Sequence, residues 1–235
     1  MKKTVLITGA SRGIGAACAR ALAADGFRVI VNYIYSEKQA RTLAEEIGGV
    51  AVRADVSQRE QVRKMFDVAG NVDVLVCCAG IAKQELFTDI TPEQWRNLFA
   101  VNVDGIYHCC QMALPYMIHE KAGKIITMSS IWGITGASCE SGYSATKAAV
   151  IGLTKALAKE LGPSGIQVNC VAPGIIETDM NRTLSPDTME MLREETPLGK
   201  IGTPKDVAEL VRFLVSDKAD FITGQVFSPN GGFLI

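Results

Sequence analysis

The sequence predicts a single α/β domain over residues 1–235, built as a Rossmann-type, doubly wound parallel sheet with helices on both faces. Three observations lead to this prediction. Short runs rich in valine and isoleucine alternate with helix-like segments along the whole chain. Most of these runs are apolar at every position, which is typical of parallel strands covered on both faces. No linker, repeat or low-complexity tract divides the 235 residues, a usual length for one domain.

Six of the apolar runs are predicted as strands, with helices between them. The helical segments begin at residues that favour N-caps, and some have proline at the first helical position. Right-handed crossovers between parallel strands then set the chirality of the fold. The predicted strands are TVLIT (4–8), RVIVNY (28–33), VAVRA (50–54), VDVLVC (72–77), KIITM (124–128) and IQVNCVA (166–172). The predicted N-caps are Ser36, Ser57, Thr91 and Thr203.

Composition limits the kinds of partner. A formal net charge of −1 gives no basic footprint for nucleic acid or an anionic membrane. Hydrophobic residues make up 48% of the chain and are spread along it, without an 18-residue apolar block that could span a bilayer. The early apolar run 5–7 is too short for the core of a signal peptide. We therefore expect a soluble protein whose partners are small molecules.

The cysteines suit a reducing compartment. There are seven, an odd number, and no C-x-x-C spacing occurs among them. This pattern fits neither a disulfide framework nor a zinc knuckle, and buried small apolar side chains are the simpler interpretation. Together with the missing export signal, it predicts a cytoplasmic protein without a metal site.

Glycines at the end of the first predicted strand indicate a phosphate-binding turn. The segment TGASRGIG (8–15) places Gly9, Gly13 and Gly15 between a strand and an expected helix. Glycines let the backbone approach a pyrophosphate at a helix N-terminus. A tight turn without a ligand is the alternative, but its position after the first strand of a βαβ unit favours a nucleotide.

A second motif, GYSATK (142–147), sets Tyr143 and Lys147 four residues apart. On a helix this is about one turn, so both side chains share a face. A free tyrosine holds its proton tightly at neutral pH, and a nearby ammonium stabilises tyrosinate and lowers the pKa of the phenol. The pair is therefore a candidate proton donor and its tuner.

Taken together, the motifs resemble the short-chain dehydrogenase/reductase family from Lys3 to Ile235. The resemblance rests on TGASRGIG, the aspartate of ADVS (54–57), CCAG (77–80), VNV (101–103), the serines before GYSATK, and VNCVAPG (168–174). It implies an enzyme that moves a hydride between a nicotinamide and a carbonyl or alcohol carbon. Such a reduction also needs an acid for the forming alkoxide.

The resemblance also implies roles for individual residues. Tyr143 would be the general acid, Lys147 would also hold the nicotinamide ribose, Ser130 would bind the substrate oxygen, and Asn102 would order a water of the proton relay. Ser129 is the rival of Ser130, and a backbone-satisfying amide is the alternative for Asn102. The other implied cofactor contacts are Gly9, Ser11, Arg12, Gly13, Ile14, Gly15, Asn32, Tyr33, Asp55, Val56, Cys78, Ala79, Gly80, Pro173, Gly174, Ile176 and Thr178.

Charge favours NADPH as the cofactor. NAD enzymes of this kind usually carry an acid for the ribose hydroxyl at the end of the second strand. Asn32 and Tyr33 stand there instead, so no carboxylate repels a 2'-phosphate. Ser11 and Arg12 in the glycine turn can bind that phosphate, because the guanidinium fork suits it. A solvated loop arginine is the alternative for Arg12.

Within the family, segments 165–180 and 221–235 look most like 3-oxoacyl-[acyl-carrier-protein] reductases of bacterial fatty-acid synthesis. Three departures stand against this: the Cys77–Cys78 pair replaces asparagines, Glu140 replaces a common glutamine, and Ser164 stands where some carry a basic residue. SSIWG (129–133) and GASCE (136–140) instead resemble paralogues that reduce a 5-aminopentanone on elongation factor P. An acid near the pocket suits a cationic amine. A non-catalytic NADP(H)-binding scaffold is the hypothesis from another class.

The last expectations concern a lid and assembly. The polar run NRTLSPDTMEML (181–192) is interpreted as a substrate lid, with a plain surface helix as the alternative. Segments 91–120 and 143–161 have apolar residues on more than one helix face, and small residues at Ala145, Ala148, Ala149, Gly152 and Ala156 permit close contact. We expect a homotetramer or homodimer, as in the resembled family, with the C-terminal GGFLI as a second contact.

Overall fold

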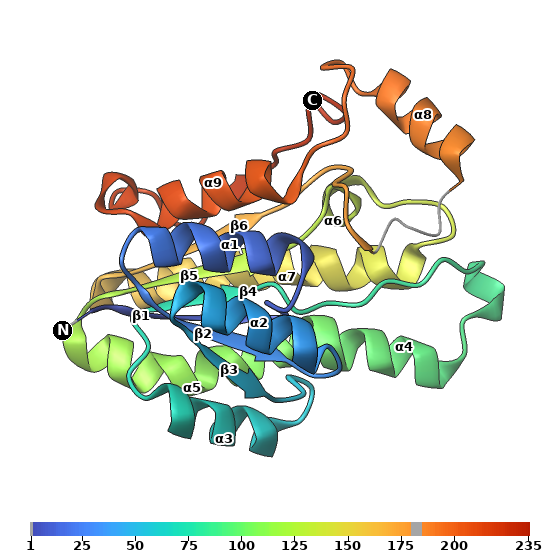
Figure 1. Cartoon of the computed structure of the whole chain (residues 1–235). Helices are drawn as coiled ribbons and strands as arrows, with labels where there is room; N and C mark the ends of the chain where they lie inside the picture. Colours follow the sequence, from blue (N-terminus) through green and yellow to red (C-terminus); the bar gives the residue numbers. More distant parts are fainter. Residues whose placement is uncertain (1, 180–184) are drawn as a thin grey trace.

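The computed structural model describes residues 2–179 and 185–235 and contains one seven-stranded, wholly parallel sheet (Figure 1). The strand order is β3-β2-β1-β4-β5-β6-β7, so β1 lies beside β2 on one side and β4 on the other. This is the switch point of a doubly wound sheet, where ligands bind beyond the carboxyl ends of the strands. The strands are β1 (Thr4–Thr8), β2 (Arg28–Tyr33), β3 (Val50–Arg53), β4 (Val74–Cys77), β5 (Gly123–Met128), β6 (Ile166–Val171) and β7 (Val226–Phe227).

Helices cover both faces of the sheet (Figure 1). α1, α2 and α9 pack on one face, and α3, α5 and α7 pack on the other. The helices are α1 (Gly13–Ala24), α2 (Glu37–Ile47), α3 (Arg59–Ala69), α4 (Pro92–Phe99), α5 (Gly105–Glu120), α6 (Ile131–Thr135), α7 (Ser141–Leu161), α8 (Pro186–Glu195) and α9 (Pro204–Val215). Shorter turns are η1 (Phe87–Asp89), η2 (Ala100–Asp104), η3 (Gly162–Ser164) and η5 (Asp217–Ala219).

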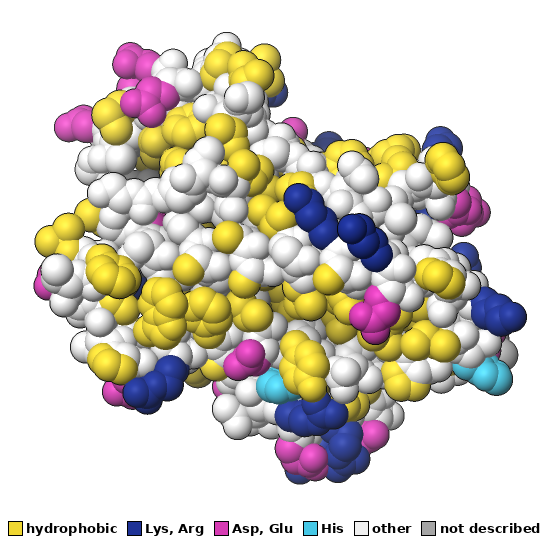
Figure 2. All heavy atoms as spheres, turned by 180° about the vertical axis from the view of Figure 1, so that it is seen from behind, with side chains coloured by type: hydrophobic (Ala, Val, Ile, Leu, Met, Phe, Trp, Pro, Cys, Tyr) yellow, Lys and Arg dark blue, Asp and Glu magenta, His cyan; other side chains and the backbone are white. Residues whose placement is uncertain are grey.

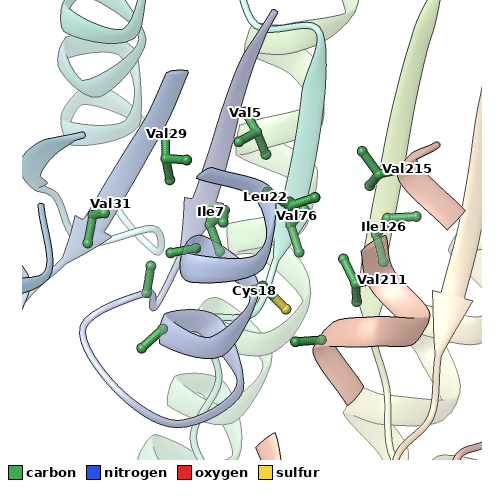
Figure 3. Close-up of a cluster of buried hydrophobic side chains, with 14 of the residues drawn as sticks. Val5, Ile7, Cys18, Leu22, Val29, Val31, Val76, Ile126, Val211 and Val215 are labelled. Carbon is green, nitrogen blue, oxygen red and sulfur yellow. The ribbon is translucent and has the colours of Figure 1, made fainter. Parts of the chain in front are cut away.

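The two faces of the sheet have separate apolar cores. Alternate residues of β1 divide between them: Val5 and Ile7 join the core under α1 and α9, whereas Leu6 joins the core under α3, α5 and α7. Figure 3 shows the first core, in which side chains of α1 and α9 meet those of the strands. Burial on both faces explains why the strand runs are apolar at every position.

The six predicted strands are confirmed within two residues at each end. The seventh strand, β7, was not expected because its two residues lie in a stretch rich in glycine and polar residues. The N-caps predicted at Thr91 and Thr203 are confirmed, and both form capping boxes. The expected cap at Ser57 is wrong, because α3 begins two residues later and Ser57 instead hydrogen-bonds to Asp55.

The segment 91–120 forms one continuous helical run made of α4, a π-helical turn η2 and α5. The turn η2 carries Asn102, whose side chain is fully buried. Single π-turns within α-helices are frequent at functional sites. The change in helical periodicity at η2 therefore sets the direction in which the Asn102 side chain points.

The C-terminal segment turns back onto its own chain. The rings of Phe233 and Trp132 meet edge to face with centroids 5.9 Å apart, and Asn230 Nδ2 donates to the Leu234 carbonyl at 2.9 Å. Within residues 231–235, Ile235 is fully exposed and the other four are half-buried. The GGFLI segment thus packs beside α6, close to the carboxyl end of β5.

Candidate active site

The glycine turn follows β1 and has no room for side chains at two positions. A Cβ at Gly9, where φ is +62°, would lie 2.8 Å from Ala79 Cα, and one at Gly15 would lie 2.6 Å from the Gly9 carbonyl oxygen. These approaches bring the turn, the start of α1 and the segment after β4 into backbone contact. The result is a cradle of backbone amides at a helix N-terminus, which suits a pyrophosphate.

Asn32 holds this turn from the end of β2. Its backbone carbonyl accepts from Ala10 N at 2.9 Å, its Oδ1 accepts from Gly9 N at 3.2 Å, and its Nδ2 donates to the Ala54 carbonyl at 3.0 Å. The side chain is buried, as is that of Tyr33. Both residues lie where the sequence predicts them, with their side chains turned into the protein rather than toward a cavity.

A cavity of about 870 Å³ lies against the glycine turn. Arg12 lies on its rim, where Nη1 donates to Ser36 Oγ at 3.3 Å and Nε lies 3.5 Å from Asp179 Oδ2. Beyond the predicted residues, Lys38 also lines the cavity, from the first turn of α2. Its charge in a run of polar residues gave no signal of its own in the sequence. The predicted residues among the lining are Ser11, Arg12, Gly13 and Thr178.

The remaining nucleotide residues follow β3 and β4. Asp55 Oδ1 accepts from the amide and hydroxyl of Ser57 at 2.9 and 2.7 Å, which fixes a turn beside Val56. Ala79 N donates to Thr8 Oγ1 at 3.0 Å, so Thr8, which the sequence reasoning missed, ties β1 to the segment after β4. Cys78 is half-buried, and its backbone touches the Cβ position of Gly9.

Gly80 joins the nucleotide segment to the second motif. A Cβ there would lie 3.3 Å from Asn102 Oδ1 and 3.4 Å from Lys147 Nζ. The structure therefore brings the segment CCAG, the π-turn and α7 together at the carboxyl ends of β4 and β5. This is the edge of the sheet at which the glycine turn also lies.

The side chain of Asn102 is fully satisfied by the protein. Its Oδ1 accepts from Ile81 N at 2.8 Å, and its Nδ2 donates to the Ile81 carbonyl at 2.9 Å and to Thr146 Oγ1 at 3.0 Å. Thr146 in turn donates to the Tyr143 carbonyl at 2.7 Å. Thr146 is a buried positioning residue that the sequence reasoning missed. The hydroxyl inside GYSATK was the available signal.

Tyr143 and Lys147 lie on one face of α7, as predicted, and both are buried. Lys147 Nζ lies 5.5 Å from the centre of the Tyr143 ring and donates to the Met128 carbonyl at 2.8 Å. Ser129 Oγ donates to the Lys147 carbonyl at 2.8 Å. Ser129 thus holds the backbone of α7.

Ser130 lies at the N-cap of α6, where its Oγ accepts from Trp132 N at 3.2 Å, and it is close enough to Tyr143 to lower the pKa of the phenol. The rival serines therefore have different partners. Ser130 faces the tyrosine hydroxyl, whereas Ser129 faces the backbone of the lysine. Of the two, only Ser130 is placed to share a ligand oxygen with Tyr143.

Burial dominates the titration of both groups. It raises the pKa of Tyr143 to about 12, against the hydrogen bond from Ser130 and with a further rise from the charge of Glu140. It lowers the pKa of Lys147 to about 8, against smaller opposing effects of Cys170, Cys78 and Cys77. The expectation that Lys147 lowers the pKa of Tyr143 is wrong for this structure, because the ammonium faces Met128 and the ring rather than the hydroxyl.

The segment after β6 closes the site from the other side. Ser129 N donates to the Val171 carbonyl at 2.7 Å, and Ile131 N donates to the Pro173 carbonyl at 3.0 Å. Gly174 lies against Asn230, since a Cβ there would be 2.8 Å from its Cα. The side chain of Ile176 lies in the core, so it can offer only its backbone to a ligand.

The predicted lid falls partly outside the described residues, which omit 180–184, and its second half forms α8. Among the described residues, no three potential ligands gather at a metal-binding distance. Within the same ranges, no helix has the length and apolarity that crossing a membrane requires.

A backbone cradle at the switch point of the sheet, beside a buried tyrosine and lysine, defines a nucleotide-dependent oxidoreductase. The chain belongs to the short-chain dehydrogenase/reductase family. The family model described as enoyl-(acyl carrier protein) reductase matches residues 9–234.

Named relatives cover nearly the whole chain. The 3-oxoacyl-[acyl-carrier-protein] reductase FabG of Staphylococcus epidermidis is 43% identical over 99% of both chains. An uncharacterized oxidoreductase, YmfI, of Bacillus subtilis is 40% identical over 99% of both. The crystal structure of a 3-oxoacyl-[acyl-carrier protein] reductase from Brucella melitensis superposes with a TM-score of 0.94 at 33% identity, covering 99% of this chain and 92% of that one.

Proposed function

We propose that this chain is an NADPH-dependent 3-oxoacyl-[acyl-carrier-protein] reductase, which converts a 3-ketoacyl thioester to the 3-hydroxyacyl product. The observation that carries the proposal is the meeting of Tyr143, Ser130 and Lys147 beside the glycine cradle. Full-length identity of 43% to a reductase of that name supports the substrate class. A non-catalytic scaffold would not need a buried lysine and tyrosine whose ionisation burial makes costly.

The cradle fits a dinucleotide. Gly9 and Gly15 leave no space for a Cβ, and the adjoining cavity is lined by Ser11, Arg12 and Lys38. Gly9, Gly13, Ile14 and Gly15 would hold the pyrophosphate, and Asp55 with Val56 would border the adenine. Cys78, Ala79 and Gly80 would lie behind the ribose, and the stretch 173–178 would cover the nicotinamide.

When bound, NADPH supplies the hydride that reduces the carbonyl carbon. Tyr143 donates its hydroxyl proton to the carbonyl oxygen as negative charge develops there, and Ser130 donates a hydrogen bond to the same oxygen. A pKa of about 12 keeps this proton on Tyr143 at neutral pH, which the reductive direction requires. Lys147 holds its ammonium beside the Tyr143 ring. Asn102 fixes the backbone of Ile81 and the side chain of Thr146, the residue that precedes Lys147.

Ser11 and Arg12 are proposed to bind the 2'-phosphate. The guanidinium lies at the rim of the cavity. The last residue of β2 is Tyr33 rather than an aspartate or glutamate, so no carboxylate stands at that position. Arg12 also donates a hydrogen bond to the hydroxyl of Ser36. Charge-assisted hydrogen bonds of this kind favour NADPH over NADH.

A second candidate is reduction of the 5-aminopentanone modification on elongation factor P. Glu140 favours it, because its charge is close enough to raise the pKa of Tyr143, and Gln84 Nε2 holds its carboxylate at 3.1 Å. A fixed acid near Tyr143 suits a cationic substrate and repels an anionic one.

Side-by-side turnover distinguishes these candidates. Acetoacetyl-carrier protein and the aminopentanone-bearing factor are compared as substrates of the wild type and of Glu140→Gln. The main proposal expects greater turnover of the thioester and at most a small effect of the substitution. Preferred turnover of the aminopentanone substrate, lost in Glu140→Gln, would instead establish the second candidate. Failure of both substrates would contradict both.

We further propose one domain, a cytoplasmic location and a homotetrameric or homodimeric assembly. All described strands join one sheet, and all seven cysteines are free. Hydrophobic side chains form a band across the rear face in Figure 2, and α5 contributes the half-exposed Tyr107 and Ile118 to the surface. On α7, Ala148, Gly152 and Ala156 are exposed. Light scattering at micromolar concentration tests the proposed assembly, and an active monomer would contradict it.

A further inference from the structure

The stretch 177–179 after β6 lies against the glycine turn. A Cβ at Gly13 would be 3.6 Å from Thr178 Cγ2, and the next residue, Asp179, places Oδ2 3.5 Å from Arg12 Nε. Both Asp179 and Arg12 line the cavity of about 870 Å³. A carboxylate therefore lies beside the guanidinium that the proposed function assigns to the 2'-phosphate.

The other charges of this cavity are arranged differently. Arg20 donates to both carboxylate oxygens of Glu46 at 2.7 and 2.8 Å, so its fork is already occupied. Lys38 lines the cavity from α2, and Glu177 lines it from the same segment as Asp179. No ion pair is described between Glu177 and Arg12. Glu177 is thus an acid that lines the same cavity but is not described as an ion-pair partner of Arg12.

The Arg12 fork has neighbours on two sides. Nη1 donates to Ser36, and the Nε side faces Asp179. A phosphate that binds an arginine through two parallel hydrogen bonds needs one edge of the fork. On the Nε edge, it would have to replace the Asp179 carboxylate, and a dianion close to that carboxylate would also be repelled.

We propose that Asp179 is a positioning residue that sets the margin between NADPH and NADH, by holding Arg12 in the free protein and yielding it to the 2'-phosphate. The proposal rests on the NADPH preference in the proposed function. Because NADH has no 2'-phosphate, it leaves the Arg12–Asp179 pair in place. The competition therefore lowers the affinity for NADPH alone.

Cofactor titration tests the proposal without any substrate. NADPH and NADH are titrated by their fluorescence against the wild type, Asp179→Asn and the matched control Glu177→Gln. Asp179→Asn is expected to tighten NADPH binding about 2- to 5-fold, as for the loss of a partly exposed charge contact to Arg12, and to leave NADH within measurement error. Glu177→Gln is expected to change both cofactors equally and less. Weaker NADPH binding in Asp179→Asn would overturn the proposal, since the pair would then preorganise Arg12.

The same titrations in an Arg12→Ala background distinguish the phosphate contact proposed for Arg12 from the role proposed for Asp179. If Asp179 acts through Arg12, Asp179→Asn has no selective effect once the guanidinium is gone. An unchanged selective effect there would overturn the proposal. If Arg12→Ala alone leaves the ratio of the two affinities unchanged, the assigned phosphate contact falls and the present proposal falls with it. If Arg12→Ala changes the ratio but Asp179→Asn does not, only the role of Asp179 is refuted. Thermal unfolding of each variant confirms that the titrated protein is folded.

Discussion

The catalytic centre and the cofactor rim are built in opposite ways. At the centre, Tyr143 and Lys147 are at most 8% exposed, and Asn102 is fully buried. At the rim, the side chains of Arg12 and Asp179 are 61% and 36% exposed. The centre is held by short hydrogen bonds to the backbone, whereas the rim is held by an ion pair open to water.

The catalytic centre therefore has a fixed geometry, whereas the charged groups of the cofactor rim can exchange partners. Buried polar groups are costly to leave unpaired, so each hydrogen bond around Asn102 restricts the others. Exposed ion pairs contribute little to stability, so Arg12 can change partners at small cost. The centre therefore suits proton transfer with defined distances, and the rim suits recognition of a ligand that arrives and leaves.

Removing the proton donor should have the largest effect. Tyr143→Phe deletes the hydroxyl and keeps the ring, so turnover is expected to fall by about 10² to 10⁴ while NADPH binding is retained. Steady-state reduction and a fluorescence titration measure the two properties. Tyr107→Phe on α5 serves as a matched control. Turnover of Tyr143→Phe within a few-fold of the wild type would exclude Tyr143 as the acid.

At the rim, Arg12→Ala should weaken NADPH by about 10- to 100-fold, as expected for the loss of charged hydrogen bonds. NADH should change little, because it lacks the phosphate. Calorimetric titration of both cofactors measures the ratio. Equal losses for the two would show that Arg12 is not the discriminating residue.

The pH dependence should reveal the buried lysine. Its pKa of about 8 means that Lys147 is charged below this pH and neutral above it, whereas Tyr143, with a pKa of about 12, stays protonated throughout. For reduction, kcat/KM is expected to fall about tenfold per pH unit above about 8. In Lys147→Arg, any remaining activity should lose this limb, since the guanidinium stays charged. A flat wild-type profile from pH 7 to 10 would contradict the role of the ammonium.

Within the catalytic centre, the smallest effect is expected at Thr146. Thr146→Val removes the acceptor of Asn102 Nδ2 and the donor to the Tyr143 carbonyl. Two neutral hydrogen bonds are lost, each corresponding to about a 2- to 10-fold change, and we expect a fall of at least that size in kcat with KM little altered. Thr146→Ser keeps the hydroxyl and should restore kcat. If the serine variant were as impaired as the valine variant, packing rather than hydrogen bonding would explain the loss.

The sequence alone allowed the sheet and most motif positions to be predicted, since apolar runs and glycine spacing are local signals. It did not allow the partners of side chains to be predicted. Asn32 lies in the predicted cofactor turn, but the sequence did not predict that its amide holds the backbone of Gly9 and Ala54. Thr8 and Thr146 hydrogen-bond to Ala79 and Asn102, which are distant in sequence, and no local pattern predicts these partners.

The pKa of Tyr143 was mispredicted for a related reason. Spacing on a helix put the ammonium near the phenol, which predicts a lowered pKa. Burial depends on the packing of α7 against β5 and β6, which helical spacing does not describe, and it is the largest cause of the raised pKa. The seventh strand was missed because a two-residue strand has no periodicity to detect.

The π-turn η2 also has a rotational consequence. An α-helix advances about 100° per residue, and a π-turn inserts about one extra residue, so α5 is turned by roughly that angle from the phase that α4 alone would dictate. One helical rod can thereby pack α4 against α7 and α5 against α3 and the sheet. Deleting a single residue within 100–104 would restore the regular phase and swing one of these faces away from its neighbours. We expect such a deletion to unfold the chain at lower temperature than any one substitution there.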